Sequence, residues 1–393
     1  MESNQPRLHL WCPDILGSRG GIQVFSAHFL EAVKSICPHL TCDVILEHDS
    51  ERNAPATSPP HTNFYFSGDW RPGLRKWAHA EKLIRLGLKQ RPKLVITTHL
   101  HFSIAAYMLK RIAGIPFWAV AHGVEAWNIK RRSLQLALRN ADRILAVSSY
   151  TRDRLLAEQD IAPERISILP NTVNPDLFQI CGKPEYLLKR YGLKASQPVI
   201  LTVSRLVTSE QYKGYDKILR ALPRIREVLP NVHYILAGHG NDRARIERLI
   251  ASLNLTDHVS LAGYVPDEEL CDHYNLCDIF AMPSKREGFG IVYLEALACG
   301  KPTLAGNKDG AADALRGGEL GVLVDPDDVE AIAQGLINIL QGVYPHPLLY
   351  HPEALRQRVI DIYGFARFKE TLASNLSEFF NGANPTAHSA AMR

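Results

Sequence analysis

Short apolar runs alternate with longer amphipathic stretches along almost the whole chain. Apolar runs bounded by turn-forming residues predict buried strands, and apolar positions that recur every three or four residues predict helices. In the first half the pattern predicts strands at Leu8–Cys12, Cys42–Glu47, Asn63–Phe66, Leu94–Thr98, Phe117–Ala121, Arg143–Val147 and Ile166–Leu169. In the second half it predicts strands at Val199–Val203, His233–Ala237, Val259–Leu261, Ile279–Met282, Thr303–Ala305 and Gly321–Val324. Helices are expected at Ile22–Ile36, Tyr215–Val228, Asp242–Leu253 and Val329–Leu340.

This alternation predicts an α/β fold, because short strands of such apolar content are typical of parallel sheets with helices on both faces. This alternation of predicted strands and helices occurs twice along the chain. We therefore expect two Rossmann-like domains facing each other across a cleft, at residues 1–175 and 196–359, with a linker at 176–195. A helix at 360–380 is expected to pack back on the first domain. Ligands bind beyond the carboxyl ends of such strands, so both sets of loops should line the cleft.

The composition is that of a globular protein, but the charge is distributed unevenly. Of the 393 residues, 46% are hydrophobic and 22% are charged, close to the globular average. The formal net charge is +4. Residues 1–195 hold 26 basic and 17 acidic side chains, a net of +9, and the remaining residues hold 19 and 24, a net of −5. Two halves of opposite charge suggest two domains with different partners.

The basic excess is concentrated in residues 71–93, which carry eight Lys or Arg against one Glu, interleaved with Trp77 and several leucines. A helix of this kind can lie on an anionic membrane surface, so we expect peripheral binding to anionic lipid. A solvated helix face is the alternative. No nucleic-acid-binding module accompanies the stretch, so nucleic acid is not an expected partner.

Other classes of protein are excluded by what the sequence lacks. The first residues show no basic region followed by an apolar stretch, so no secretory signal is expected. No apolar run approaches the roughly 18 residues needed to span a bilayer. The seven cysteines are scattered without a CxxC pair, which predicts reduced thiols rather than a disulfide framework or a zinc cage. We therefore expect a cytoplasmic protein.

A glycine-rich turn follows the strand at Ile279–Met282, and a helix is expected to start near Gly290. Backbone N–H groups left uncovered at a helix N-terminus bind anions such as phosphate. Glu287 on the turn and Glu295 in the helix could then hold hydroxyls on either side of a diphosphate. The alternative is two ordinary charges around a helix cap. Glu295 argues against it, since it lies among apolar residues, where a charge needs a partner or a ligand.

Two cations follow the first strand of the second domain. Arg205 comes directly after this strand, and Lys213-Gly214 opens the next helix. Cations at neighbouring loop positions suit a diphosphate and stabilise the charge that develops on a leaving nucleotide. Ordinary salt bridges are the alternative.

Three further features are less specific. Gly20-Gly21 follows the first strand, where a missing side chain admits a phosphate, although a plain turn also explains the pair. In Gly238-His239-Gly240 the third glycine of the dinucleotide motif is replaced by Arg243, so a nicotinamide dinucleotide site is not expected. His122 ends a strand and is expected in the cleft, where a structural role is equally open.

Two apparent metal motifs have simpler explanations. The DxD in Asp325–Asp328 precedes a predicted helix, where Asp is a normal N-cap. His99 and His101 would point the same way but lack an evident third ligand. No metal site is therefore expected, and a role for His101 in the cleft or at an acceptor stays open.

Together these features resemble the retaining glycosyltransferases of family four, also called group 1 or glycogen-synthase-like transferases, which have the two-domain GT-B fold. The resemblance is carried by EGFGIVYLEALACGKP with its glutamates eight residues apart, SRL, YKG, the strand-end His-Gly and the N-terminal Gly-Gly. Family-like segments are ILAVSSYTRDRL, ILPNTVNPDLF, LAGHGNDRARIERL and VSLAGYVPDEEL. They cover nearly the whole chain in the family's order.

The resemblance implies roles for individual residues. The implied catalytic residues are Arg205, Lys213, Glu287 and His122. The implied donor-binding residues are Gly21, Gly288, Phe289, Gly290, Ile291, Val292, Glu295, Tyr264 and Val265. The two cations and Gly21 would contact the diphosphate, while Glu287 and His122 would lie near sugar hydroxyls. Glu295 would bind the ribose, the backbone of 288–292 the sugar and diphosphate, and the loop 263–265 the nucleobase.

The implied function is a metal-independent, retaining hexosyl transfer that needs no cofactor. The donor would be a nucleotide sugar, by family frequency a UDP-sugar, and the hexose glucose or a related sugar. The acceptor, a saccharide or a lipid-linked molecule in polysaccharide or glycoconjugate synthesis, would bind the N-terminal domain at the inner face of the cell membrane. The alternative is a UDP-sugar 2-epimerase on the same fold. A non-enzymatic sugar-binding protein usually carries the secretion signal that is not expected here.

Overall fold

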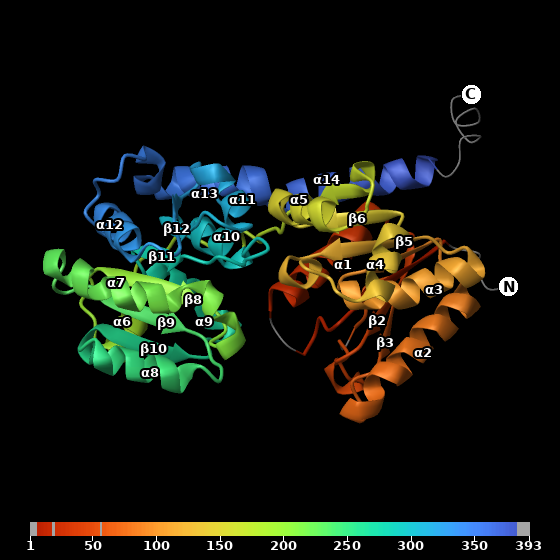
Figure 1. Cartoon of the computed structure of the whole chain (residues 1–393), viewed down its shortest axis with the longest axis horizontal. Coiled ribbons are helices and arrows are strands. Elements are labelled where there is room, and N and C mark those ends of the chain that lie inside the picture. Colours follow the sequence, from red (N-terminus) through yellow and green to blue (C-terminus); the bar gives the residue numbers. More distant parts are fainter. Residues whose placement is uncertain (1–5, 18–19, 56, 383–393) are drawn as a thin grey trace. The chain divides into compact units, whose positions relative to one another are not determined.

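The computed structural model describes residues 6–17, 20–55 and 57–382 (Figure 1). The chain divides into two compact units. Unit 1 contains the described residues up to Thr172 together with those from Phe365 onward, and unit 2 contains Val173–Gly364. Each unit has its own parallel β-sheet with helices packed against it, so the predicted α/β class is confirmed.

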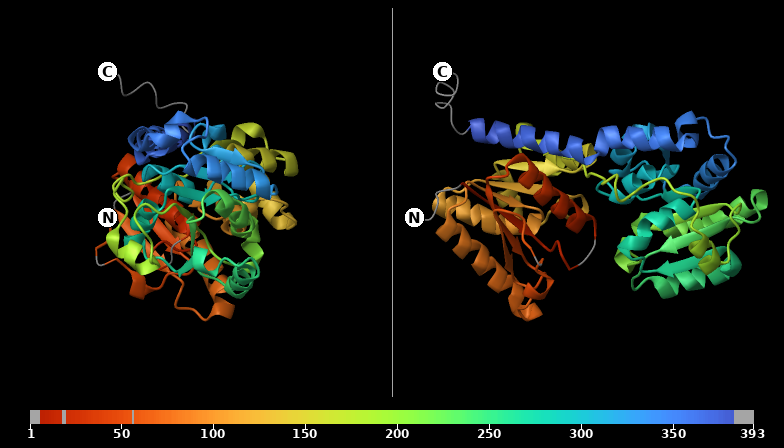
Figure 2. Two further views of the ribbon diagram at one scale, coloured as in Figure 1. Left: turned by 90° about the vertical axis from the view of Figure 1, so that its left-hand side faces the viewer. Right: turned by 180° about the vertical axis from the view of Figure 1, so that it is seen from behind.

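Unit 1 is built around a parallel sheet of seven strands in the described ranges, in the order β3-β2-β1-β4-β5-β6-β7. Its strands are β1 (Arg7–Cys12), β2 (Thr41–Leu46), β3 (Thr62–Phe66), β4 (Leu94–Thr97), β5 (Phe117–Ala121), β6 (Arg143–Ala146) and β7 (Ile166–Ile168). Its helices are α1 (Gly21–Ile36), α2 (Pro72–Gln90), α3 (Ser103–Ala113), α4 (Arg132–Arg139), α5 (Ser149–Glu158) and α14 (Phe365–Gly382). Helix α14 lies against α1 (Figure 2).

Unit 2 is built around a parallel sheet in the order β10-β9-β8-β11-β12-β13. Its strands are β8 (Val199–Val203), β9 (His233–Ala237), β10 (Val259–Gly263), β11 (Ile279–Met282), β12 (Thr303–Gly306) and β13 (Val322–Val324). Its helices are α6 (Glu185–Tyr191), α7 (Tyr215–Val228), α8 (Arg243–Ser252), α9 (Asp267–Leu276), α10 (Ile291–Ala298), α11 (Ala311–Ala314), α12 (Val329–Leu340) and α13 (Pro352–Tyr363). Strands β8, β11 and β12 are neighbours, so the loops at their carboxyl ends meet at one edge.

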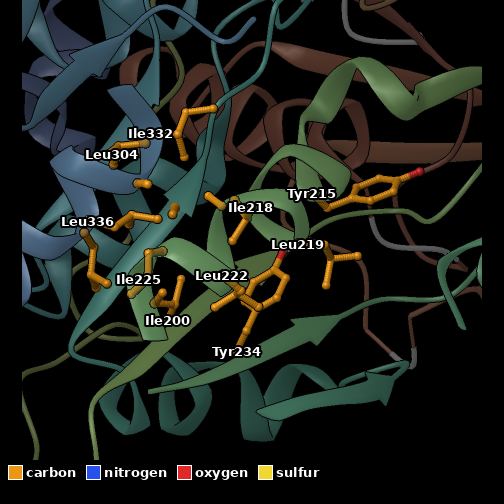
Figure 3. Packing of buried hydrophobic residues seen from close by; sticks show 14 of the residues in the cluster. Ile200, Tyr215, Ile218, Leu219, Leu222, Ile225, Tyr234, Leu304, Ile332 and Leu336 are labelled. Carbon is orange, nitrogen blue, oxygen red and sulfur yellow. The ribbon is translucent and has the colours of Figure 1, made fainter. Parts of the chain in front are cut away.

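The core of unit 2 shows why its strands are short apolar runs. Helices α7 and α12 pack against each other and against the sheet (Figure 3). Ile218 and Ile225 of α7 and Leu336 of α12 are buried in this cluster. Burying one such side chain contributes about 1.5–3 kcal/mol. Strands covered on both faces keep no polar alternation, which is the pattern seen in the sequence.

The expected strands are all confirmed, each within two residues of its expected ends. The prediction of a single helix at 360–380 is wrong. Helix α13 ends at Tyr363 and α14 begins at Phe365, because the backbone of Gly364 is extended, with ψ of 158°. Gly364 also pairs with Val173 in an isolated parallel bridge, which fixes the break.

The segment 176–195, expected as a linker, belongs to unit 2 and contains α6. Leu187 of α6 is buried, and Arg190 forms an ion pair of 2.6 Å with Glu269 of α9. None of the helices formed by the described residues is both long enough and apolar enough to cross a lipid bilayer.

Candidate functional site

The turn between β11 and α10 is held by a buried carboxylate that follows β12. The backbone N–H of Glu287 donates to Asp309 Oδ2 at 2.6 Å, and the Ser284 hydroxyl donates to the same oxygen at 2.7 Å. The N–H of Ala311 donates to Asp309 Oδ1 at 3.0 Å. Burial raises the pKa of Asp309 to about 6, although these hydrogen bonds oppose the shift. Asp309 thereby fixes where Glu287 stands.

Glycines allow the two loops to approach each other closely. A Cβ at Gly310 would lie 2.0 Å from the carbonyl oxygen of Gly288, and one at Gly306 would lie 1.8 Å from that of Ser284. The Gly310 N–H donates to the Glu287 carbonyl at 2.8 Å. Any side chain at either glycine would push the turn out of place.

Helix α10 begins at Ile291, next to Gly290, where its start was expected. Gly290 is the N-cap with φ of 86°, a left-handed conformation that favours glycine, and no side chain caps the helix there. Helix geometry gives the first N–H groups, including those of Ile291 and Val292, no intrahelical acceptor. Gly288 is buried, and Phe289 packs edge-on against Tyr363 with ring centroids 5.4 Å apart.

Lys213 and Glu287, two of the residues singled out in the sequence, form an ion pair. Lys213 Nζ lies 2.6 Å from Glu287 Oε2, and the side chains are only 15% and 18% exposed. Burial lowers the pKa of Lys213, but the charge and hydrogen bond of Glu287 outweigh it, so the pKa is raised. The Lys285 N–H donates to the Tyr212 carbonyl at 3.0 Å, which ties the two segments together.

Arg205 stands on the neighbouring loop after β8 and is 70% exposed. Its guanidinium pairs with Glu210, which lies in the 3-10 helix Thr208–Lys213. The expected salt bridges therefore exist for both Arg205 and Lys213. Both cations lie on loops at the carboxyl edge of the β-sheet of unit 2 (sheet 2), where a diphosphate was expected.

The glycines of Gly238-His239-Gly240 have a packing role. A Cβ at Gly238 would lie 1.7 Å from the Ser204 carbonyl oxygen, and one at Gly240 2.1 Å from that of Leu206. The Leu206 N–H also donates to the His239 carbonyl at 2.9 Å. This motif positions the Arg205 loop, which accounts for its glycines without a dinucleotide.

Glu295 has the internal partner that its apolar surroundings require. The Tyr274 hydroxyl of α9 donates to Glu295 Oε2 at 2.7 Å, and Glu295 is 3% exposed. Burial, followed by the charge of Glu295, raises the pKa of Tyr274 well above its usual range. Glu295 is thus held in a fixed position in the middle of α10.

The loop after β10, expected at a nucleobase, is more exposed. Tyr264 is 61% exposed, and its ring packs edge-on against His239 with centroids 5.7 Å apart. Val265 is half-buried. The Gly263 carbonyl accepts the Gly238 N–H at 2.7 Å, which joins this loop to the one after β9.

Gly21 and His122, the other two sequence-predicted residues, belong to unit 1. Gly21 starts α1, and a Cβ there would meet no atom within 4 Å, so packing does not demand a glycine. His122 Nε2 lies 2.8 Å from the Thr98 carbonyl oxygen, and its backbone N–H donates to Glu125 at 2.5 Å. Burial lowers the pKa of His122. A neutral ring then donates from Nε2 to the carbonyl.

His99 and His101 form a hydrogen-bonded chain with Glu47, which the sequence did not reveal. Their Nδ1 atoms lie 2.7 Å apart, and His101 Nε2 lies 2.9 Å from Glu47 Oε2 at the end of β2. Burial raises the pKa of Glu47, but the hydrogen bond from His101 and nearby histidines outweigh it and lower the pKa to about 2.

The DxD segment is occupied by structural contacts. Asp328 caps α12 by accepting the Ala331 N–H at 2.9 Å, as expected. Asp325 pairs with Lys308 at 2.6 Å, and Asp327 pairs with Lys285 at 2.8 Å. Within the residues that the structure describes, no three His, Cys, Asp or Glu side chains are placed to share a metal ion.

Sequence reasoning missed Asp309, Glu210 and Tyr274, which hold the predicted residues in place. Asp309 had a signal in the sequence, because Asp309-Gly310 after β12 resembles Glu287-Gly288 after β11. No local pattern in the sequence points to Glu210 or Tyr274, because tertiary packing determines which residues they contact.

Two protein-family models match the chain. The model described as "Glycosyltransferase Family 4" matches residues 20–177, and the model described as "Glycosyl transferases group 1" matches residues 185–347. They coincide with the two runs of strands and helices, and together they cover most of the chain.

Curated relatives carry sugar-transfer names. A GDP-mannose-dependent alpha-(1-6)-phosphatidylinositol monomannoside mannosyltransferase of Mycolicibacterium smegmatis is 35% identical over 237 residues, 56% of this chain and 60% of the relative. A D-inositol 3-phosphate glycosyltransferase of Thermobispora bispora is 31% identical over 243 residues, 57% of this chain and 56% of the relative. The chain thus spans about 60% of the length of the curated relatives it matches.

Solved structures share the fold over nearly the full length. The sucrose-phosphate synthase of Thermosynechococcus elongatus has a TM-score of 0.79 at 20% identity, covering 96% of this chain and 100% of the other. Anabaena HepE in complex with UDP and glucose has a TM-score of 0.77 at 18% identity, covering 95% and 100%. These similarities confirm the GT-B fold. By its two family models and its fold, the chain belongs to the family 4, group 1 glycosyltransferases.

Proposed function

We propose that this chain transfers a sugar from a nucleoside diphosphate to a saccharide or lipid-linked acceptor. The observation that carries the proposal is the Lys213–Glu287 ion pair of 2.6 Å, which lies at the same edge of sheet 2 as Arg205 and the glycine-rich start of α10. Cations, a carboxylate and uncovered backbone N–H groups are the groups that a sugar diphosphate requires.

Each residue has a distinct task in this proposal. The donor diphosphate takes Lys213 and Arg205 as its cations, which releases Glu287 to accept hydrogen bonds from sugar hydroxyls. The N–H groups of 288–292 contact the diphosphate at the helix N-terminus. Negative charge grows on the diphosphate as the sugar leaves, and cations fixed beforehand stabilise that transition state. Glu295, oriented by Tyr274, binds the ribose.

We further propose that the transfer retains the anomeric configuration and needs neither a metal ion nor a cofactor. Asp309, the carboxylate bonded to this turn, already accepts three hydrogen bonds and is not free to act as a nucleophile. The acceptor hydroxyl then attacks the donor sugar from the same face from which the leaving diphosphate departs. An oxygen of the donor phosphate accepts the proton of the acceptor hydroxyl. Arg205 and Lys213 supply the positive charge that a metal ion would otherwise provide.

The donor is a UDP-sugar or GDP-mannose. The resemblance to family four implies, by family frequency, a UDP-sugar of glucose or a related hexose, while mycobacterial relatives are named GDP-mannose-dependent. The kind of acceptor is also inferred from the names of relatives, which mention phosphatidylinositol monomannoside and inositol 3-phosphate. A lipid-linked acceptor agrees with a basic unit 1 at the inner face of a membrane. The relatives and structures named above carry no epimerase name, and the epimerase alternative predicts turnover without acceptor.

Substitution of the two key residues tests the proposal. Glu287→Ala and Arg205→Ala should each lower kcat/KM for transfer by at least about 100-fold, the usual effect of removing one transition-state contact. Lys285→Ala is the matched control, because this cation lies on the same turn but pairs with Asp327. It should stay within about twofold of the parent chain.

Circular dichroism and the melting temperature would show that each variant is folded. Arg205 is 70% exposed, so its removal leaves packing intact even if Glu287→Ala destabilises unit 2. Near-normal turnover in the folded Arg205→Ala or Glu287→Ala variant would overturn the assignment.

Thermal stabilisation identifies the donor. A ligand that binds only the folded state raises the melting temperature, by an amount that grows with concentration over Kd. We expect one of UDP-glucose and GDP-mannose to stabilise the chain at a concentration where the other has no effect. The same shift should be lost in Arg205→Ala and kept in Lys285→Ala. Equal shifts with both donors, or none with either, would contradict a specific nucleotide-sugar site.

A further inference from the structure

Two cysteines that lie far apart in the sequence meet in unit 2. Cys271 is in α9, and Cys299 follows the last residue of α10. Their sulfur atoms are 3.9 Å apart, in direct contact. Cys299 is fully buried, while Cys271 is partly exposed. The pair therefore has one sulfur that a small reagent can reach and one that only its neighbour can reach.

The surroundings favour the thiolate on Cys271. Asn275 Nδ2 lies 3.4 Å from Cys271 Sγ and donates toward it. The hydrogen bond from the Cys299 thiol is the largest cause that lowers the pKa of Cys271, to about 6, while burial opposes it. The same hydrogen bond, followed by burial, raises the pKa of Cys299. Because the thiolate is the nucleophile, Cys271 is the member of the pair that reacts first.

We propose that Cys271 and Cys299 form an oxidation site that closes to a disulfide when the chain meets a hydroperoxide. The Cys271 thiolate attacks one peroxide oxygen and breaks the O–O bond, which forms a sulfenic acid and releases an alkoxide, or hydroxide if the oxidant is hydrogen peroxide. This anion takes up a proton from water, equivalent to the proton that Cys271 lost on ionising, and leaves as an alcohol or water. The Cys299 sulfur then attacks the sulfenic sulfur and expels hydroxide, which leaves as water with the Cys299 proton. Two thiols lose two electrons, and the peroxide gains them.

The geometry permits closure with a small movement. A disulfide has an S–S distance of about 2.05 Å, so the sulfurs must approach by about 1.9 Å, which is within the reach of side-chain rotation. Cys299 is the C-cap of α10 and donates its N–H to the Glu295 carbonyl at 3.1 Å. Closure therefore joins α9 to α10 one helical turn from the Tyr274–Glu295 hydrogen bond. The proposal stands independently of the sugar transfer proposed above.

Peptide mapping of the full chain tests this site. Reduced protein is treated with hydrogen peroxide, its free thiols are blocked with iodoacetamide, and its peptides are analysed by mass spectrometry. We expect a linked peptide pair containing Cys271 and Cys299, about 2 Da lighter than the reduced pair, which dithiothreitol reverses. Failure to find this pair in oxidised, folded protein would overturn the proposal.

Cysteine variants distinguish the sulfur that reacts with the peroxide from the sulfur that then closes the disulfide, and a third variant serves as a control. Cys271→Ser should abolish the link, and Cys299→Ser should instead leave a sulfenic acid on Cys271 that dimedone traps. Cys181→Ser is the matched control, because Cys181 is exposed and its N–H bonds to Asn275. It should keep the Cys271–Cys299 link. Loss of the link in Cys181→Ser, or dimedone labelling elsewhere than Cys271 in Cys299→Ser, would contradict the proposed pair.

Discussion

Asp309 shows at the scale of one residue how the protein fixes its candidate site. A carboxylate that is 1% exposed is costly unless every oxygen finds donors. Here one oxygen accepts from Glu287 and Ser284, and the other accepts from Ala311. The position of the turn that carries Glu287 depends on these hydrogen bonds. Asp309 is therefore a positioning residue.

Replacing Asp309 should change the pH dependence of stability. The pKa of Asp309 is about 6 in the folded chain against an ordinary value of 3.8. Between these values the folded chain holds a proton that the unfolded chain has lost, so rising pH favours unfolding through this group. Asp309→Asn removes this dependence. It also turns an amide N–H toward the Ala311 N–H, which destabilises the variant.

Urea denaturation at pH 4.5 and 7.5 measures the effect. The loss of unfolding free energy in Asp309→Asn should be larger at pH 4.5 than at pH 7.5, by about 1–3 kcal/mol. Leu336→Ala is the control, because it destabilises the same unit by removing a buried side chain that does not titrate. The loss of unfolding free energy in this variant should be the same at both pH values. Parallel pH profiles for the parent chain and Asp309→Asn would contradict the argument.

At the scale of a single element, helix α2 exposes large apolar side chains on one part of its surface and buries others. Its buried face carries Leu83 and Leu86, while Leu74 and Trp77 are 56% and 78% exposed. Lys76 is exposed between them. Large apolar side chains that project from a basic helix favour insertion into an anionic membrane over a solvated face.

The double substitution Leu74→Ser with Trp77→Ser should reduce binding to vesicles that contain phosphatidylserine by at least about fivefold in a sedimentation assay. Both side chains are mostly exposed, so folding should be unaffected. Leu177→Ser is the matched control, as an apolar residue of unit 2 that is 59% exposed. The parent chain should bind less at higher salt. Equal sedimentation with neutral and anionic vesicles would count against the membrane proposal.

At the scale of the whole molecule, unit 1 is discontinuous in sequence. The chain leaves it after Thr172 and returns at Phe365. Helix α14 then completes its core, since Phe368, Leu372 and Leu376 are buried and Phe368 packs edge-on against Phe25 at 5.8 Å. Arg143 Nη1 donates to Asn375 at 2.6 Å. Helix α14, at Phe365–Gly382, is thus part of the fold of unit 1.

A substitution in α14 should therefore weaken unit 1 and spare unit 2. Leu372 is fully buried, so Leu372→Ala should lower the free energy of unfolding of unit 1 by about 2–5 kcal/mol. Hydrogen exchange followed by mass spectrometry would show faster exchange in β5 and β6 with unchanged exchange in β8 and β11. Arg367→Ala, on the exposed side of α14, should have no effect. Equal acceleration in both units would refute the assignment.

The sequence predicts the sheets well and the site only partly. Strands such as β5 and β8 are recognisable because parallel strands are apolar throughout. Glu287 and Gly290 are recognisable because they belong to a glycine-rich turn between a strand and a helix, which is a local sequence pattern. The break at Gly364 was missed because its apolar spacing continues across it. The Tyr274–Glu295 and Cys271–Cys299 contacts were missed because they depend on how α9 packs against α10, which no local periodicity encodes.

The discontinuity of unit 1 sets an order of events on the ribosome. At about 5–20 residues per second, synthesis of Val173–Gly364 takes about 10–40 seconds. Throughout that time the nascent unit 1 has strands β1 to β7 but not α14, so Phe25 of α1 lacks its contact with Phe368 and Trp118 of β5 lacks its contact with Phe379. Unit 2 is contiguous and can finish folding first. During translation the strands of unit 1 are therefore made before unit 2, but unit 1 is completed after it.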